Sequence, residues 1–313
     1  MSRRDEKSLL AAILLAGSAA LTPAAAEDGP VFGGTMKTIL GRGTILIGHR
    51  DAAPPFAFLN RAGQPVGFSM DLCNAIAADV AAALSRDLLE PGAPAWQTGI
   101  RIVYVPVTSD ARLPMVAGGQ IDLECGSTTA NAERAKTVAF SPNFFVAGTK
   151  LMVPATAAAA SYRDLAGKTI AVSAGTTNVA VIERIAKTLD RPAKLVQPPS
   201  LEAAYALLDA DQADAVASDD ILLAGLMATH ASAKRFHIIG DYLSFEPYAI
   251  AFRRDDPAFA DLVQQTFQRL AADGSLRAAY GRWFQARLPN GERLNVPMSP
   301  QLTELFRGLG QPD

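Results

Sequence analysis

Short apolar runs alternate with helix-like patterns along most of the chain. Residues 44–48 predict a buried strand, and Ser69 stands where the N-cap of a following helix is expected. The apolar positions of that helix recur every four residues, at Leu72, Ile76, Val80 and Leu84. The same reasoning predicts further strands at 101–105, 121–124, 168–173, 194–196, 213–217, 236–239 and 248–252. It predicts further helices at 109–116, 177–189, 201–208, 257–270 and 275–284, and one from Ile221. This alternation is typical of parallel βαβ units.

Two extended segments, 144–151 and 245–252, interrupt the alternation. If both are crossovers, residues 148–246 form one lobe, and residues 38–147 and 247–287 together form the other. Two lobes joined by two strands can close over a cleft about a hinge. One continuous sheet is the alternative.

The two ends of the chain carry separate signals. Basic residues precede an apolar stretch of small side chains at 9–21, and Ala24-Ala25-Ala26 offers a cleavage site. We therefore expect residues 1–26 to be a signal peptide that is cleaved near Ala26, so that the mature protein reaches the periplasm. The apolar stretch is too short for a membrane anchor. Residues 288–313 are expected to form an irregular tail with a short helical piece near 302–306.

Composition excludes several classes of function. The chain has 313 residues with 49% hydrophobic and 19% charged, enough for one large or two moderate domains. A formal net charge of -2 argues against a surface for nucleic acid. The three histidines and two cysteines lack the spacing of metal ligands, so we expect no metal and no cofactor. Cys73 and Cys125 can form at most one disulfide, and we expect two buried thiols.

The segment 124–134, ECGSTTANAER, carries the strongest sign of ligand chemistry. Ser127 and Thr129 are two positions apart, so both project to one side of an extended segment. Arg134 follows within one turn, and a guanidinium can hold a carboxylate with two parallel hydrogen bonds. The segment therefore indicates a site for a small anion. The alternative is a helix capped by Thr129 or Asn131 and followed by a solvated arginine.

Other polar residues follow predicted strands, where ligands bind in open α/β sheets. They are Arg50, Ser109, Arg112, Ser173, Thr176 and Asp219. Three arginines and one aspartate complement a ligand with two carboxylates and one ammonium, because unpaired buried charge is costly. Each of these residues also has an ordinary alternative role. The arginines could be surface residues, Ser173 and Thr176 could be turn or capping residues, and Asp219 could cap the next helix. Phe56 and Phe58 are expected either to pack in the core or to wall the pocket.

Several ordered motifs together resemble a known family, the periplasmic solute-binding proteins of polar amino-acid ABC transporters. The resemblance covers about residues 44 to 287, and within the family it is strongest to the glutamate/aspartate-binding members. The motifs are IGHR at 47–50, PF at 55–56, GFSMDL at 67–72, ECGSTT at 124–129, ER at 133–134, FS at 140–141, DLAGK at 164–168, SAGTT at 173–177 and DDILLAG at 219–225.

This resemblance implies a fold and a set of ligand contacts. The fold is the two-lobed type II clamshell, or Venus flytrap, in which each lobe is a mainly parallel sheet flanked by helices. The α-carboxylate of an amino acid would be held by Ser127, Thr129, Arg134, Ser173 and Thr176. The α-ammonium would pair with Asp219, and a side-chain carboxylate would bind Arg50, Ser109 and Arg112. The family's acidic-amino-acid members place a histidine before the helix that begins near Leu201, and this chain has none.

The resulting expectation is a monomeric, non-enzymatic binding protein. It would capture L-glutamate or L-aspartate in the periplasm by hinge closure and deliver it to an ABC transporter permease in the inner membrane. Two alternatives stay open. One is a binding protein for another polar amino acid. The other is a dehydratase-like periplasmic enzyme on the same scaffold, which would need a general acid such as Asp219 or Asp220.

Overall fold

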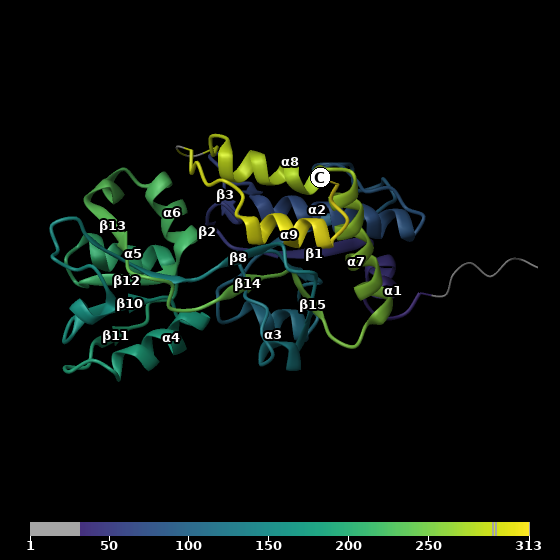
Figure 1. The fold of residues 1–313 in the computed structure, drawn as a ribbon. Helices are drawn as coiled ribbons and strands as arrows, with labels where there is room; N and C mark the ends of the chain where they lie inside the picture. The colour runs from purple at the N-terminus through teal and green to yellow at the C-terminus, as the bar shows by residue number, and fades with distance from the viewer. Residues whose placement is uncertain (1–31, 290, 292, 313) are drawn as a thin grey trace, which may run out of the picture. The chain divides into compact units, whose positions relative to one another are not determined.

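Two five-stranded sheets organise the computed structural model, which describes residues 32–289, 291 and 293–312 (Figure 1). The expected signal peptide lies outside these residues. The first sheet has the strand order β5 (Arg101–Pro106), β1 (Thr44–His49), β6 (Leu123–Glu124), β15 (Ala251–Arg253) and β7 (Val138–Phe140). The second has the order β11 (Lys194–Val196), β10 (Thr169–Val172), β12 (Ala215–Asp219), β9 (Thr149–Pro154) and β13 (Phe236–Ile239). Four strands of each sheet share one direction, and β15 and β9 are the reversed strands. The predicted α/β class with two mainly parallel sheets is confirmed.

The two segments predicted as crossovers pair with each other. Each breaks into two short strands, so β8 (Phe145–Ala147) precedes β9 and β14 (Glu246–Tyr248) precedes β15. β8 and β14 are antiparallel, with Ala147 opposite Glu246. Each reversed strand therefore directly follows one strand of this two-stranded ribbon. β9 comes before the βα units of the second sheet, and β15 comes after the βα units of the first sheet. The lobe limits at 148 and 246 stay a prediction.

Helices cover the strands of each sheet and carry the polar loops. On the first sheet they are α1 (Gly34–Arg42), α2 (Phe68–Ala83), α3 (Arg112–Ala117), α7 (Pro257–Ala272) and α8 (Ser275–Tyr280), which a π-helical turn (Gly281–Gln285) extends. On the second they are α4 (Thr177–Ala186), α5 (Leu201–Asp209) and α6 (Asp220–Thr229). In the part of the chain described, no helix combines the length and the apolar character needed to span a membrane. We call each sheet with its helices the first lobe and the second lobe.

The structure differs from the local predictions at three places. Ser69 does not cap α2, because Gly67 occupies the N-cap position and the Ser69 hydroxyl donates to the Gly126 carbonyl at 2.7 Å. The glycine-rich segment before β1 forms α1, which was not predicted. The helical piece expected near 302–306 is present and is longer than expected, as α9 (Pro300–Gly308), which is capped by Ser299, whose side chain accepts a hydrogen bond from the Leu302 amide.

Cys73 and Cys125 form a disulfide, so the prediction of two free thiols was wrong. Cys73 lies in α2, and Cys125 follows β6 of the sheet that α2 covers. Their Cα atoms are 6.2 Å apart, within the range that a disulfide spans. Both side chains are fully buried. The sequence alone gave no register between helix and strand, which is what decides this pairing.

Aromatic rings fill the space where the ribbon meets the first lobe. Phe56 contacts Phe145 and Tyr248 of the ribbon, with ring centroids 5.1 and 5.0 Å apart, and Phe284 at 5.6 Å. Phe56 is fully buried, so it packs in the core and does not wall a pocket. Phe58 packs against Trp283. The remaining small sheet, β2 (Ala52–Ala53), β3 (Ala57–Leu59) and β4 (Pro65–Val66), holds these phenylalanines in place.

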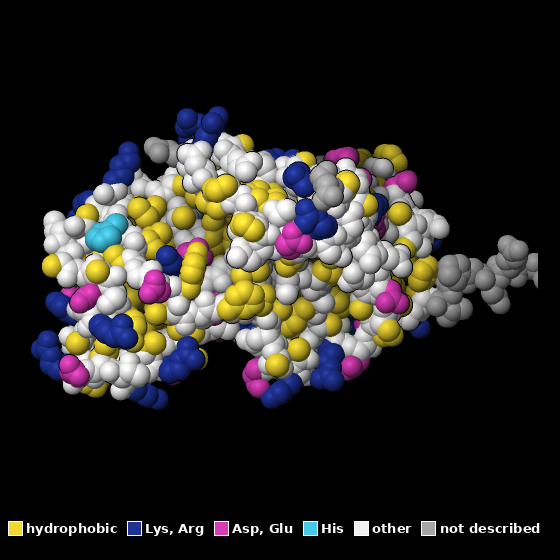
Figure 2. Space-filling view, viewed as in Figure 1, with side chains coloured by type: hydrophobic (Ala, Val, Ile, Leu, Met, Phe, Trp, Pro, Cys, Tyr) yellow, Lys and Arg dark blue, Asp and Glu magenta, His cyan; other side chains and the backbone are white. Residues whose placement is uncertain are grey.

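Figure 2 shows apolar side chains gathered on one face between the ribbon and α9. They surround a hollow in the surface, whose lining includes Phe145, Phe245 and Leu302. Tyr242 and Phe245 are exposed there by 61% and 72% of their surfaces. α9 closes one side of this hollow with Gln301 and Leu302.

The disulfide generates a first prediction. Replacing both cysteines, Cys73→Ala with Cys125→Ala, should lower the free energy of unfolding by about 4 kcal/mol, because the bond closes a loop over a sequence separation of 52. Denaturant unfolding with and without a reductant measures this. The wild type should lose stability with reductant, and the double variant should not respond to it. If the wild type and the double variant lost the same stability on addition of reductant, the result would contradict the presence of the disulfide.

Candidate functional site

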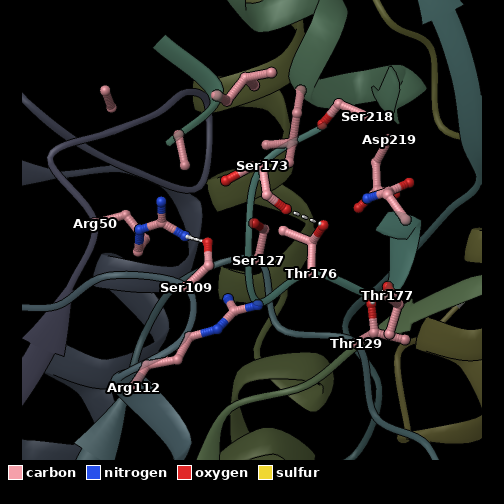
Figure 3. Close-up of a pocket in the computed structure, with 15 residues that line it drawn as sticks. Arg50, Ser109, Arg112, Ser127, Thr129, Ser173, Thr176, Thr177, Ser218 and Asp219 are labelled. Atoms are coloured by element: carbon pink, nitrogen blue, oxygen red, sulfur yellow. Dashed lines mark hydrogen bonds between the residues drawn. The ribbon is translucent and has the colours of Figure 1, made fainter. Parts of the chain in front are cut away.

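A pocket between the two lobes gathers eight of the nine predicted site residues (Figure 3). They are Arg50, Ser109, Arg112, Ser127, Thr129, Ser173, Thr176 and Asp219. Figure 3 shows Arg50 and Ser109 on one side and Asp219 on the other, with Ser127, Ser173 and Thr176 between them. The predicted residues therefore meet in space, although they span 170 positions of the sequence from 50 to 219.

Strand ends explain why these residues converge. Arg50 follows β1 and Ser127 follows β6 in the first lobe, and these two strands are parallel neighbours. In the second lobe Ser173 follows β10, while Asp219 is the last residue of the neighbouring parallel strand β12. Carboxyl ends of parallel strands share one sheet edge, where ligands bind in open α/β folds. Two such edges face each other across the pocket.

The arginine side of the pocket is buried and incompletely paired. Arg50 donates through Nη1 to the Ser109 hydroxyl. Burial, with repulsion from Arg112, lowers the pKa of Arg50 to about 10, so the side chain stays charged at neutral pH. Arg112 is 3% exposed, and its Nη1 lies 3.7 Å from Oε1 of Glu124. Its Nε and Nη1 have no hydrogen-bond partner among the described residues. A buried guanidinium in this state favours an anionic partner.

The aspartate side of the pocket is acidic, and its hydrogen bonding is also incomplete. The Tyr248 hydroxyl donates to Oδ2 of Asp219, and Oδ1 has no partner among the described residues. Burial raises the pKa of Asp219 to about 7, and repulsion from Glu246 and Asp220 contributes to the rise. A cation beside Oδ1 would favour the ionised carboxylate. Asp219 stands at the N-cap position of α6 but makes no capping hydrogen bond, so the helix-cap alternative was wrong.

Hydroxyl groups line the space between the two charged sides. The Thr176 hydroxyl donates to the Ser173 carbonyl at 2.7 Å and leaves its oxygen able to accept. The Ser173 hydroxyl has no partner among the described residues. Thr176 stands at the N-cap of α4 without a capping side-chain bond, so the capping alternative was also wrong for this residue. The hydroxyls are placed to hydrogen-bond a small polar ligand.

Arg134 does not line the pocket. Its Nη1 donates to the Thr129 carbonyl at 2.9 Å, and its Nη2 donates to the Gly175 carbonyl at 3.4 Å, joining the two lobes. Burial lowers its pKa to about 10. The short turn Arg134–Lys136 is capped by Asn131, whose Oδ1 accepts from the Arg134 amide. The segment 124–134 therefore contains a turn held by Asn131, as the alternative expected, while Ser127 and Thr129 line the pocket and Arg134 is half-buried and not solvated.

Two buried carboxylates escaped the charge count made from the sequence. Glu124 is fully buried beside Arg112, and its Oε2 accepts from the Thr128 hydroxyl. Glu246 is 3% exposed and belongs to β14 of the ribbon. Neither lines the pocket. The signal for Glu124 was its place in a buried strand end, and the signal for Glu246 was a carboxylate in an otherwise apolar crossover.

The sequence also gave no sign of the apolar wall of the pocket. This wall consists of Ala52, Ala53, Leu201 and Leu222. Leu201 begins α5, the helix before which the acidic-amino-acid members of the resembled family place a histidine. Three further polar residues, Thr177, Asn178 and Ser218, complete the lining. Because α5 and α6 both contact β2, the second lobe supplies the leucines and the first lobe the alanines.

The arrangement is suited to a small zwitterion with a second anionic group. Among the residues that line the pocket, the atoms that lack partners are two guanidinium nitrogens, a hydroxyl and a carboxylate oxygen, and these complement carboxylate and ammonium groups. The apolar wall can cover methylene groups between them.

Comparisons with known proteins agree with this geometry. Residues 92–286 match the bacterial extracellular solute-binding proteins, family 3. The chain is similar to the L-glutamate/L-aspartate-binding protein of Pseudomonas aeruginosa, with 36% identity over 279 residues and 87% of each chain covered. It is also similar to the glutamate/aspartate import solute-binding protein of Escherichia coli K12, with 30% identity over 306 residues, 97% of this chain and 96% of the relative.

Solved structures of amino-acid-binding proteins share the fold. A variant of ArgBP from T. maritima superposes with a TM-score of 0.67 at 28% identity, covering 80% of this chain and 99% of that one. An ancestral arginine-binding protein bound to arginine gives a TM-score of 0.66 at 28% identity, covering 78% and 99%. The expected two-lobed fold is therefore shown both by the sheets themselves and by these neighbours.

The raised pKa of Asp219 generates a second prediction. The folded chain holds this proton more tightly than the unfolded chain, so the resulting stabilisation is greatest at acid pH and is lost as pH rises through about 7. The measurement is the free energy of unfolding of the wild type and of Asp219→Asn over a range of pH. The wild-type advantage should fall by about 1.4 kcal/mol per pH unit between about pH 4.5 and pH 6.5 and then level off. A difference that is constant with pH would contradict the assignment.

Proposed function

Because the chain belongs to the bacterial extracellular solute-binding proteins, family 3, we propose that it is the periplasmic substrate-binding component of an amino-acid ABC transporter that captures L-glutamate or L-aspartate. The observation that carries the proposal is a pair of arginines, the half-buried Arg50 and the buried Arg112, facing Asp219 across one pocket. The named relatives bind these two amino acids. A disulfide in the chain is in keeping with an oxidising compartment.

In the proposed complex the ligand bridges both sides of the pocket. Its ammonium pairs with the free oxygen of Asp219, and its side-chain carboxylate binds Arg50, Ser109 and Arg112. Its α-carboxylate lies among Ser127, Thr129, Ser173 and Thr176 and accepts hydrogen bonds from the hydroxyls of Ser127 and Ser173. The hydroxyls of Thr129 and Thr176 already donate to Glu246 and to the Ser173 carbonyl, and Arg134 lies close behind Thr129. These roles account for each pocket atom that lacks a protein partner.

Capture proceeds by closure of the two lobes about the ribbon. The ligand favours the closed form because only this form brings the groups of both lobes onto one molecule. Small residues make the close approach possible. A Cβ at Gly225 in α6 would lie 2.1 Å from the Pro54 carbonyl of the first lobe, so the two backbones touch where only glycine fits. The closed protein would then be the form that the membrane permease recognises.

An enzyme on the same scaffold is the competing proposal. One structural neighbour is an ancestral amino-acid-binding protein described as a precursor of cyclohexadienyl dehydratase. A carboxyl group with a pKa of about 7 in a pocket can act as a general acid. In this pocket, however, the same carboxyl faces two guanidiniums that complement a dicarboxylic amino acid. Incubating the protein with glutamate and analysing the ligand by mass spectrometry separates the two proposals, since a binding protein returns it unchanged.

Ligand selectivity is the third prediction. Isothermal calorimetry on the ligand-stripped mature protein should show binding of L-glutamate, L-aspartate or both with a Kd of about micromolar. L-glutamine should bind much more weakly, because its side chain offers no negative charge to Arg50 or to the Arg112 nitrogens that Glu124 leaves without a hydrogen bond. L-arginine should bind weakly, because its guanidinium would face Arg50 and Arg112. Equal affinities for glutamine and glutamate would overturn the dicarboxylate proposal.

A fourth prediction isolates the charge of Arg50. Arg50→Met keeps most of the length of the side chain and removes the guanidinium. Glutamate and aspartate affinity should fall on the order of a hundredfold, because a buried charge loses its partner. The exposed Arg61, replaced as Arg61→Met, is the matched control and should bind like the wild type. The result that would contradict the assignment is an equal loss of affinity in both variants.

A further inference from the structure

A single carboxylate behind the pocket holds a residue from each lobe. Oε2 of Glu246 accepts hydrogen bonds from the hydroxyls of Thr129 and Thr177, each at 2.7 Å. Thr129 follows β6 of the first lobe, and Thr177 is the first residue of α4 in the second lobe. Glu246 itself belongs to β14 of the ribbon. This carboxylate therefore touches both lobes and the hinge between them.

Burial gives these two hydrogen bonds their weight. Glu246 is 3% exposed and Thr129 is 4% exposed. A buried carboxylate that loses a hydrogen-bond donor suffers a large desolvation penalty unless water replaces the donor. Separation of the lobes would move Thr129 and Thr177 apart, so Glu246 would keep at most one of them. The carboxylate therefore favours the arrangement in which the lobes are together.

A second residue of the same strand acts on the same pocket. Tyr248 lies two positions after Glu246, so both side chains project from one side of β14, and both are buried. The Tyr248 hydroxyl holds Asp219 of the second lobe. One strand of the ribbon thus orients three pocket residues: Thr129, Thr177 and Asp219.

We propose that Glu246 is a positioning residue that couples closure of the two lobes to occupation of the pocket, by holding Thr129 and Thr177 together through one carboxylate oxygen. The inference rests on the proposed function, because it takes the pocket to be the ligand site. Glu246 does not line the pocket, so it acts through the threonines.

A purely local role is the alternative. Glu246 lies at the N-terminus of α4, where a negative charge stabilises the helix dipole. That role concerns the second lobe alone and predicts a change in stability without a change in the distance between lobes. The coupling role predicts that the Thr177 hydroxyl matters as much as the carboxylate.

The test uses three variants of the full mature protein. Glu246→Ala removes the acceptor, and Thr177→Val removes one donor while conserving the shape of the side chain. Thr177→Ser keeps the hydroxyl and is the matched control. Fluorophores are attached to the exposed positions Lys136→Cys and Lys187→Cys, one on each lobe, because the two native cysteines are bound to each other.

Two readouts are taken from each variant. The first is energy transfer between the fluorophores without ligand, which reports the separation of the lobes and does not depend on which ligand binds. The second is stopped-flow association and dissociation of L-glutamate. We expect lower transfer in Thr177→Val and Glu246→Ala, and dissociation faster on the order of tenfold with association nearly unchanged. Thr177→Ser should behave like the wild type in both readouts.

The outcomes separate the two proposals. Transfer that is unchanged in Thr177→Val would overturn the coupling role, even if Glu246→Ala fails to fold. Equal changes in Thr177→Val and Thr177→Ser would also overturn it, because the hydroxyl would then not be the group involved. Failure of the wild type to bind glutamate or aspartate would overturn the proposed function instead, while the ligand-free transfer would still decide the role of Glu246.

Discussion

The structure depends on the mutual neutralisation of charges buried around one pocket. Three guanidiniums, of Arg50, Arg112 and Arg134, lie among three carboxylates, of Glu124, Asp219 and Glu246. Charges removed from water must be paired or hydrogen-bonded, or the folded state suffers a large penalty. The exceptions are the contact between Arg112 and Glu124, which at 3.7 Å is too long for a hydrogen bond, and the free oxygen of Asp219; of these three side chains, Arg112 and Asp219 line the pocket. The unpaired atoms of these two pocket residues are therefore the groups available to bind a charged ligand.

The ribbon of β8 and β14 carries this pocket on a rigid base. Its aromatic side chains, Phe145 and Tyr248, pack against Phe56, so the strands that connect the lobes are fixed to the first lobe. Glu246 and the hydroxyl of the same Tyr248 reach pocket residues, Glu246 the hydroxyls of Thr129 and Thr177, and Tyr248 the carboxylate of Asp219.

Most of the fold and the pocket could be predicted from the sequence, because strand ends are marked by local pattern. Arg50, Ser127 and Asp219 each follow an apolar run, and the rule that ligands bind at carboxyl ends brings them together. The disulfide, the Ser69 hydrogen bond to Gly126 and the role of Glu246 could not be predicted. Each depends on the register between segments distant in sequence, and neither periodicity nor residue type encodes that register. Arg134 is a further example within the segment 124–134. Its position in the sequence places it near the pocket, but its side chain is directed by contacts that include the Gly175 carbonyl of the other lobe, which the sequence does not reveal.

Pairing of β8 with β14 also determines where the second sheet is joined to the rest of the chain. All five strands of that sheet lie between Thr149 and Ile239, directly inside the two paired strands. Paired strands lie about 4.8 Å apart, so the stretch begins and ends at neighbouring points. It is therefore a cassette with adjoining ends, which could be exchanged between relatives as one piece. Ser173, Thr176 and Asp219 would travel with it, while both pocket arginines would stay behind.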